Sequence, residues 1–139
     1  MAIEIRNYKN FMNVKYVNGE TETISLRNDD LLKKKVFDGN LKEIEIGNGV
    51  KKICERAFMD CTSLTTITLP SSLKRIECNT FVGCTSLQEI IIPNTLLNVV
   101  CKLDARGVSE ITLHKPSSDE LIEYLQKGFA MDLYFEGDY

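Results

Sequence analysis

The sequence is poor in the residues and segments on which several classes of protein depend. It has a single histidine, His114, so general acid–base catalysis near neutral pH is poorly supplied. No stretch approaches the roughly 18 apolar residues of a membrane-spanning helix, and the first residues lack the apolar run of a signal peptide. The formal net charge of −3 provides no basic field for phosphates. We therefore expect neither nucleic acid nor membrane as a ligand, and a cytoplasmic location, or the cell surface if a leader has been removed.

The five cysteines occur in no pattern that binds a metal ion. They are spaced by 7, 17, 6 and 17 residues and include no C-x-x-C pair. An odd number of cysteines without an export signal favours free thiols in a reducing compartment. The G-x-S-x-G, glycine-rich phosphate-loop and H-E-x-x-H motifs are also absent. We therefore predict no metal site, no cofactor and no catalytic residue, and we expect that the protein is not an enzyme.

What the sequence has instead is an internal repeat, whose units open at Leu41, Leu64 and Leu87. The first unit carries Leu41, Ile44, Ile46, Val50 and Ile53 at the repeated positions. Later positions coincide after a shift by one unit: Phe58 with Phe81, Cys61 with Cys84, Leu64 with Leu87, Ile67 with Ile90, Leu69 with Ile92, Pro70 with Pro93, Leu73 with Leu96 and Ile76 with Val99. A shortened fourth copy begins at Val108, with Ile111 and Leu113 at the same L-x-x-I-x-L spacing. A period of this length built on that spacing is typical of leucine-rich repeats.

The spacing also predicts where each side chain lies. Successive side chains of a strand point to opposite faces, so Ile67 and Leu69 point inward while their threonine neighbours point outward. One such strand cannot bury its apolar face, but stacked copies that pair in a parallel ladder form a continuous core. Pro70 and Pro93 end the strands because proline has no backbone donor. The second half of each unit, from Leu73 to Cys84 in one copy, is predicted to return as a short extended or irregular segment, with Cys61 and Cys84 as small buried hydrophobes.

The complete pattern L-x-x-I-x-L-P-x-x-L-x-x-I-x-x-x-x-F-x-x-C resembles the BspA-like, or Treponema-type, leucine-rich repeat. Residues 58–99 follow it almost position for position, and the resemblance covers about residues 41–113. It implies a small curved solenoid that serves as a protein-binding or adhesion module. Members of this family are often exported and have many more repeats than the roughly three in this chain.

The segments on either side of the repeats are expected to cap them, because the end units of a solenoid otherwise expose core. Before the repeats, Asn18-Gly19 between two alternating segments predicts a β-hairpin. Ile24 and Leu26 are expected to lead into a degenerate first repeat, and a helical turn or two is expected between residues 29 and 40, with Lys33 to Lys35 exposed to solvent.

After the repeats, the stretch PSSDELIEYLQKG predicts a helix that starts at Ser117 as N-cap, with Glu120 three residues later, and stops at Gly128. Leu121, Ile122 and Leu125 share one face of it. The final FAMDLYFEGDY predicts a last strand, with Leu133 and Phe135 packed under the cap. The expected fold is therefore mostly β: a short leucine-rich-repeat solenoid of about three 23-residue repeats in one compact domain. Its expected parts are a hairpin and cap in residues 1–40, repeats in 41–113 and a helix–strand cap in 114–139.

The outward face of the repeat strands is the candidate binding surface. Its predicted residues contain four acids, three threonines, an isoleucine and no base: Glu43, Glu45, Thr66, Thr68, Glu89, Ile91, Glu110 and Thr112. Such a row attracts a basic partner. The other half of each unit has a basic character from Lys51, Lys52, Lys74 and Arg75. An ordinary solvated sheet is also polar and rich in threonine, so this alternative stays open.

These features favour a non-catalytic protein–protein interaction module that acts through the exposed strand face. It would be an inhibitor or adaptor inside the cell that makes it, or inside a host cell if the gene belongs to a phage. The alternative is an adhesion or surface-binding fragment of a BspA-like protein. His114 is expected at the surface, and nothing in the sequence specifies the oligomeric state.

Overall fold

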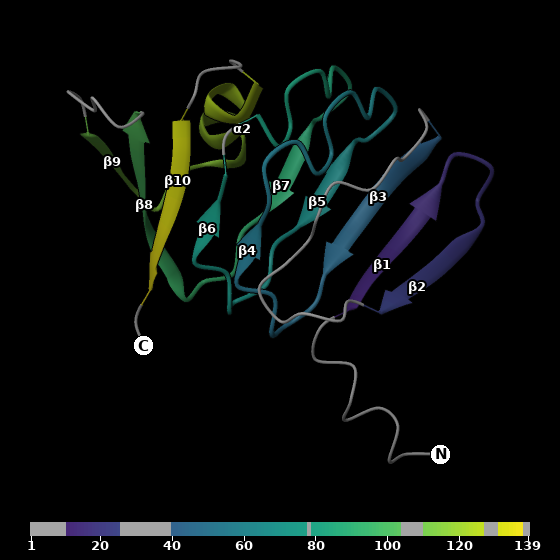
Figure 1. Ribbon diagram of the computed structural model, residues 1–139, viewed down its shortest axis with the longest axis horizontal. Coiled ribbons are helices and arrows are strands. Elements are labelled where there is room, and N and C mark those ends of the chain that lie inside the picture. The colour runs from purple at the N-terminus through teal and green to yellow at the C-terminus, as the bar shows by residue number, and fades with distance from the viewer. Residues whose placement is uncertain (1–10, 26–39, 78, 104–109, 127–130, 138–139) are drawn as a thin grey trace, which may run out of the picture.

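The computed structural model describes residues 11–25, 40–77, 79–103, 110–126 and 131–137, and these form two five-stranded sheets and a helix. The first sheet has the order β2-β1-β3-β5-β7, with β1 (Phe11–Tyr16), β2 (Thr21–Ser25), β3 (Leu41–Ile46), β5 (Thr66–Thr68) and β7 (Glu89–Ile91). The second has the order β4-β6-β10-β8-β9, with β4 (Lys52–Ile53), β6 (Arg75–Ile76), β10 (Met131–Gly137), β8 (Leu96–Leu103) and β9 (Glu110–His114). The helix is α2 (Ser118–Gln126). Figure 1 shows the hairpin β1–β2 at one end of the molecule and β8, β9 and β10 at the other.

The repeat strands pair with the offset that the sequence predicts. In the parallel ladder β3-β5-β7, Ile44 pairs with Ile67 and Ile67 with Ile90, so each partner lies one repeat unit further along the chain. The second sheet has the same offset where β4 pairs with β6, because Ile53 lies opposite Ile76. The return segment is therefore extended over two residues in each of these units, as β4 and β6, and otherwise forms turns. The strands β5 and β7 end before Pro70 and Pro93, as predicted.

One hydrophobic cluster fills the space between the sheets. Equivalent positions stack on one another, and the rings of Phe58 and Phe81 lie parallel with centroids 5.4 Å apart. The cluster continues from Met12 in the hairpin to Leu133 and Phe135 in β10, so the predicted packing of these last two residues is confirmed. Burial of this apolar surface is the main source of stability for the stack.

The turns repeat as closely as the strands do. Arg56 and Asn79, which occupy equivalent positions in successive units, have φ of 63° and 61°, and Asp60 and Gly83 have φ of 62° and 82°. A Cβ on Gly83 would collide with Oδ1 of Asp60. Both copies have the left-handed conformation, which glycine adopts without strain, so this close approach is what distinguishes the second copy from the first.

The N-terminal hairpin is confirmed, and its strand β1 lies beside the repeat strand β3. Gly19 has φ of 90° and donates its N–H to the carbonyl of Tyr16 at 2.9 Å, which closes the turn. Ile24 lies in β2, an edge strand that pairs only with β1 in this sheet, and β1 runs antiparallel to β3. The hairpin turns the chain back and places β1 next to the ladder. That Ile24 and Leu26 lead into a degenerate first repeat stays a prediction, because the structure does not describe the residues that follow β2. Leu26 and the expected helical turns with Lys33 to Lys35 lie outside the described residues.

The C-terminal helix and strand are confirmed, and both of them cover repeat edges. The backbone N–H of Glu120 donates to Oγ of Ser117 at 3.1 Å, as an N-cap requires, and Leu121, Ile122 and Leu125 are buried. The expected stop at Gly128 lies outside the described residues. The hydroxyl oxygen of Ser118 accepts a hydrogen bond of 2.6 Å from the backbone N–H of Ile90, so α2 occupies the edge of β7. In the second sheet β10 pairs with β6 on one side and β8 on the other.

This arrangement overturns the prediction of a fourth repeat strand in the ladder. Val108 lies outside the described residues, and Ile111 and Leu113 belong to β9, which pairs antiparallel with β8 in the second sheet. The place beside β7 that a fourth copy needs is already taken by α2. A three-position spacing predicts a strand and its inward face, but it does not specify which neighbour the strand selects.

Candidate functional site

Two rows of side chains cross the outward face of the first sheet. Residues directly opposite each other on paired strands lie on the same face, so the pairing defines each row. We call this surface the strand face. Its first row is Thr23, Asn13, Glu45, Thr68 and Ile91, and its second row is Thr21, Lys15, Glu43, Thr66 and Glu89.

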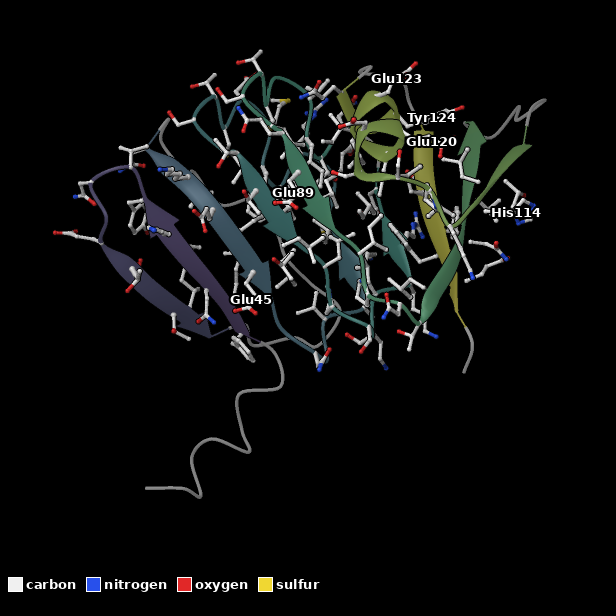
Figure 2. All side chains as sticks on the ribbon, turned by 180° about the vertical axis from the view of Figure 1, so that it is seen from behind. Glu45, Glu89, His114, Glu120, Glu123 and Tyr124 are labelled. Carbon is white, nitrogen blue, oxygen red and sulfur yellow. The ribbon has the colours of Figure 1, made fainter. Side chains whose placement is uncertain are left out.

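The structure brings six of the eight predicted surface residues together on the strand face. Glu45 and Glu89 are exposed, and Ile91 has 45% of its surface accessible. Glu43, Thr66 and Thr68 are half-buried by their neighbours. Figure 2 shows Glu45 and Glu89 on the side of the first sheet that is turned toward the viewer. The alternation rule therefore places these residues correctly; whether they bind a partner stays a prediction.

The other two predicted residues are elsewhere. Glu110 and Thr112 are in β9, where they pair with Lys102 and Val100 of β8 in the second sheet. They do not extend the strand face, because β9 is separated from β7 by α2 and by the change of sheet. The prediction that placed them in the same row is wrong, because β9 pairs with β8 and α2 takes the place beside β7 that a fourth repeat strand needs.

The hairpin supplies four further residues that the repeat analysis missed: Asn13, Lys15, Thr21 and Thr23. A signal was present, since FMNVKY alternates apolar and polar residues, with Met12 and Val14 buried. Asn13 donates from Nδ2 to Oε1 of Glu45 at 2.9 Å and accepts at Oδ1 from the hydroxyl of Thr23 at 2.6 Å. These two bonds connect β2, β1 and β3 and hold the amide in one orientation.

Lys15 changes the charge pattern that the sequence predicts. It is exposed and lies opposite Glu43, so the surface contains a base where none was expected. Three carboxylates, those of Glu43, Glu45 and Glu89, share the strand face with this one ammonium group, which leaves a formal charge of −2. The side chains of Glu43, Glu89 and Lys15 make no hydrogen bond or ion pair with another described residue. The strand face is therefore acidic, but less uniformly than the repeat strands alone indicate.

A shallow hollow of about 450 Å³ lies over four of the five strands of this sheet. Its walls come from the outward residues of β1, β2, β3 and β5, with Glu22 at the hairpin edge. The residues of β7 do not line it. The N-terminal hairpin thus supplies part of the wall of this hollow.

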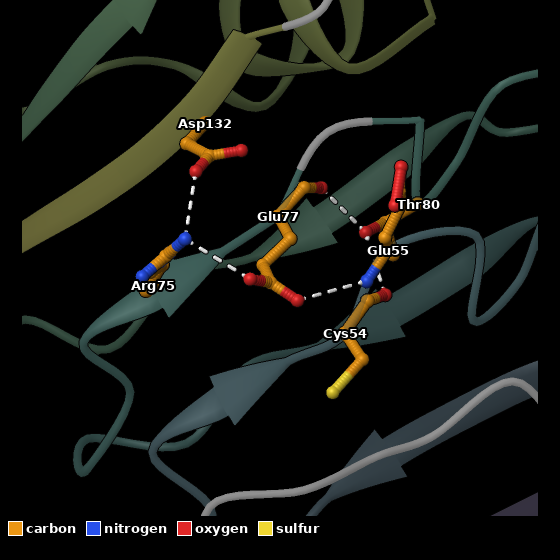
Figure 3. Close-up of polar contacts among 6 residues, drawn as sticks. All are labelled: Cys54, Glu55, Arg75, Glu77, Thr80 and Asp132. Carbon is orange, nitrogen blue, oxygen red and sulfur yellow. Dashed lines mark hydrogen bonds and ion pairs between the residues drawn. The ribbon is translucent and has the colours of Figure 1, made fainter. Parts of the chain in front are cut away.

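The basic residues on the other side of the repeats are partly neutralised. One guanidinium nitrogen of Arg75 lies 3.0 Å from Asp132 and 3.0 Å from Glu77 (Figure 3). The guanidinium group also lies 5.4 Å from the centre of the Tyr134 ring. Glu77 also accepts a hydrogen bond from the backbone N–H of Glu55 at 3.1 Å. Arg75 therefore connects β6 to β10, the strand that caps the second sheet. Of the four basic residues predicted on this side, this one is already paired within the fold.

A buried threonine, Thr80, lies in the turn that follows β6. Oγ1 of Thr80 lies 3.0 Å from the carbonyl of Cys54 and 2.6 Å from that of Glu77, so its single proton serves two carbonyls (Figure 3). It is the one buried polar side chain in the described core. These bonds hold one turn of the chain against the preceding turn and suggest a structural role.

The repeated cysteines are buried, as predicted. Burial raises the pKa of the Cys61 thiol to about 11 and that of Cys84 to about 12. The thiol of Cys84 donates to the carbonyl of Phe58 at 3.2 Å. Both groups are therefore protonated near neutral pH and lack the thiolate character of a reactive cysteine.

His114 is exposed, as predicted, and its Nδ1 lies 2.9 Å from Oδ1 of Asn98. Among the described residues no three His, Cys, Asp or Glu side chains are grouped so that they could hold a metal ion. In the same part of the chain no helix has the length and apolarity to cross a membrane.

Comparison with known proteins agrees with the repeat. A family model described as BspA type leucine-rich repeat region (6 copies) matches residues 6–102, which extends the match back over the hairpin and ends it before β9. No curated protein and no solved structure gives a significant match. Repeats of this kind generally bind proteins and are generally not catalytic. A model that matches most of the chain, together with a parallel ladder offset by one repeat unit per strand, shows that the chain belongs to the BspA-type leucine-rich repeat family.

Proposed function

We propose that this protein is a non-catalytic interaction module that binds another protein through the strand face. The observation that carries the proposal is a set of outward side chains that the fold itself does not pair. The carboxylates of Glu43, which is half-buried, and Glu89, which is exposed, have no hydrogen bond or ion pair to another described residue, and Ile91 exposes 45% of its surface. A side chain that contributes little to packing or pairing is free to contact a partner.

The scaffold suits such a role. We interpret the stacked units as a short solenoid whose caps, α2 and β10, cover the edges of β7 and β6. The capped stack presents the strand face on a sheet whose inward side belongs to the hydrophobic cluster. A rigid surface loses little conformational entropy when it binds.

Charge gives the partner its expected character. Adjacent strands lie about 4.8 Å apart, so Glu43 and Glu89, two strands apart, are separated by little more than the Debye length of roughly 8 Å. Together with Glu45 they attract a basic surface, and such attraction acts mainly on the association rate. Since no reaction is proposed, binding itself would be the effect, as in an adaptor or an inhibitor. We propose that this occurs in the cytoplasm, a reducing compartment that suits the odd number of cysteines in the sequence.

The experiment compares three forms of the protein as bait in a native lysate: the parent, the double variant Glu45→Lys with Glu89→Lys, and Glu136→Lys as control. Glu136 is exposed on β10 and lies outside the strand face. We expect proteins retained by the parent and by the control to be lost from the double variant, with all three melting at similar temperatures. For a retained protein, the association rate should fall in the double variant and depend less on salt. Equal retention by all three forms would contradict the proposal, as would a loss caused by the control alone.

A further inference from the structure

The hollow on the strand face indicates which kind of partner segment would bind there, on the assumption that the proposed function is correct. The hollow of about 450 Å³ is within the range of roughly 300–1,000 Å³ that binding pockets occupy in proteins. It is lined by threonine, asparagine, lysine and glutamate side chains around β3, together with Val14 and Ile44. The lining contains no aromatic ring, and its carboxylates and hydroxyl groups offer partners to a charged or hydrogen-bonding ligand.

Of the three acidic side chains that line the hollow, Glu43 and Glu45 are on β3, and these two have different surroundings. One carboxylate oxygen of Glu45 accepts the 2.9 Å hydrogen bond from Asn13, whose amide is fixed in turn by Thr23. The second oxygen of Glu45 has no partner among the described residues. Because the donor holds the carboxylate in place, an incoming cation meets an oriented acceptor and loses less side-chain entropy on binding. Glu43 has no such support, but it is half-buried between Lys15 and Thr66.

The distance between Glu43 and Glu45 along β3 matches the spacing of side chains in an extended partner segment. Glu43 and Glu45 are two residues apart on β3 and point the same way, which places their Cα atoms about 6.7 Å apart. An extended chain has this same interval between side chains on one of its faces. Two adjacent residues in such a chain point to opposite sides and cannot both reach the hollow.

Lys15 limits how far a basic partner can extend. It lies opposite Glu43 on β1 and is exposed, so a third positive charge on that side would meet repulsion. On the other side Thr68 and Ile91 offer uncharged contacts, and the carboxylate of Glu89 is on β7, outside the hollow. Within the hollow the charge pattern therefore favours two basic groups along β3.

From this we propose that the hollow binds an extended segment of a partner protein with basic side chains at alternate positions, such as Arg-x-Arg, which lies along β3. The two basic groups contact Glu43 and Glu45. Asn13 acts as a positioning residue for Glu45, and the intervening residue points away from the sheet.

Fluorescence anisotropy with short labelled peptides tests this inference. The probes are Thr-Arg-Thr-Arg-Thr and its isomer Thr-Arg-Arg-Thr-Thr, which have the same composition and charge but differ in the interval between arginines. We expect the alternating peptide to bind about threefold or more tightly than the isomer at 0.15 M salt. Glu43→Gln and Glu45→Gln should each weaken the alternating peptide by about two- to fivefold, the range of an exposed ion pair. Asn13→Ala should weaken it about twofold and leave the isomer unchanged.

Glu136→Gln on β10 is the matched control, and it should bind both peptides as the parent does. Equal affinity for the two isomers, or an alternating peptide that is indifferent to Glu43→Gln and Glu45→Gln, would overturn the inference. If the peptides fail in this way while the Glu45→Lys, Glu89→Lys variant still loses its captured partner, the proposed function stands and only the extended basic segment is wrong. If peptide affinity is the same for the two isomers and for the variants, and the Glu45→Lys, Glu89→Lys variant also retains the captured partner, both proposals fail.

Discussion

A single substitution in the parallel ladder tests both the stacking and the assignment of inward and outward faces. Ile67 and Ile91 are on neighbouring strands, β5 and β7, and differ chiefly in burial, since Ile67 is 0% exposed and Ile91 is 45% exposed. We compare the same change, isoleucine to aspartate, at both positions. The ladder predicts that aspartate at position 67 faces the core and that aspartate at position 91 faces solvent.

The magnitude follows from burial. Removing the Ile67 side chain from a packed core costs about 2–5 kcal/mol. A carboxyl group left there without a partner has its pKa raised by up to about 3–5 units, and each unit costs about 1.4 kcal/mol at a pH where the unfolded chain is ionised. Together these contributions reach about 6–12 kcal/mol, which is comparable to the roughly 5–15 kcal/mol unfolding free energy of a typical domain. At position 91 the same change should cost about 1 kcal/mol or less, as surface substitutions usually do.

Urea unfolding followed by far-ultraviolet circular dichroism measures both variants. We expect Ile67→Asp to be largely unfolded at pH 7 and Ile91→Asp to unfold close to the parental midpoint. Because the buried carboxyl has a raised folded-state pKa, Ile67→Asp should recover stability as the pH falls toward the carboxyl's ordinary range of about 4. A milder variant, Ile67→Val, should cost about 0.5–1.5 kcal/mol and keeps the comparison measurable if the aspartate variant does not fold. The reasoning is refuted if aspartate costs the same at both positions or costs more at position 91.

Three further predictions concern the stack and its caps. Cys61 and Cys84, with their pKa raised to about 11 and 12 by burial, should react slowly with a thiol reagent at pH 8 and rapidly in denaturant; a Cys61–Cys84 disulfide found by mass spectrometry would contradict this. Ser118→Ala should lower the unfolding free energy by about 1 kcal/mol, because the N–H at the edge of β7 loses its acceptor, and an unchanged urea midpoint would show that α2 does not seal that edge. Gly83→Ala should destabilise the protein by about 1–3 kcal/mol because of its φ of 82° and its collision with Asp60; Asp60→Ala in the same chain should restore part of this, and no restoration would mean that backbone conformation alone sets the cost.

Local periodicity was sufficient for much of the fold. The repeat period predicts the pairing of Ile44 with Ile67 and of Ile67 with Ile90, because copies of one unit bury the same face in the same way. The helix from Ser118 and the hairpin turn at Gly19 follow from capping and turn chemistry within a few residues.

The same local rules predict the orientation of side chains within a strand. Alternation places Glu45, Thr66 and Thr68 outward whatever the strand's neighbours are, so these predictions survive. The residues of the hairpin follow the same alternation, but their membership of the surface depends on which strand lies beside β3. The repeat pattern alone therefore does not reveal Asn13 and Lys15 as part of the strand face.

Only the tertiary structure decided which strands and helix lie next to the repeat ladders. The spacing at Ile111 and Leu113 matches a repeat strand, yet α2 occupies the edge of β7 and β9 pairs with β8 instead. In the same way β10 enters between β6 and β8, where the paired residues from Met131 to Gly137 satisfy the backbone of β8. A strand's own sequence specifies its inward face because side chains alternate along it. The choice of partner depends on which backbone donors and acceptors other segments leave unpaired, and that is a property of the whole chain.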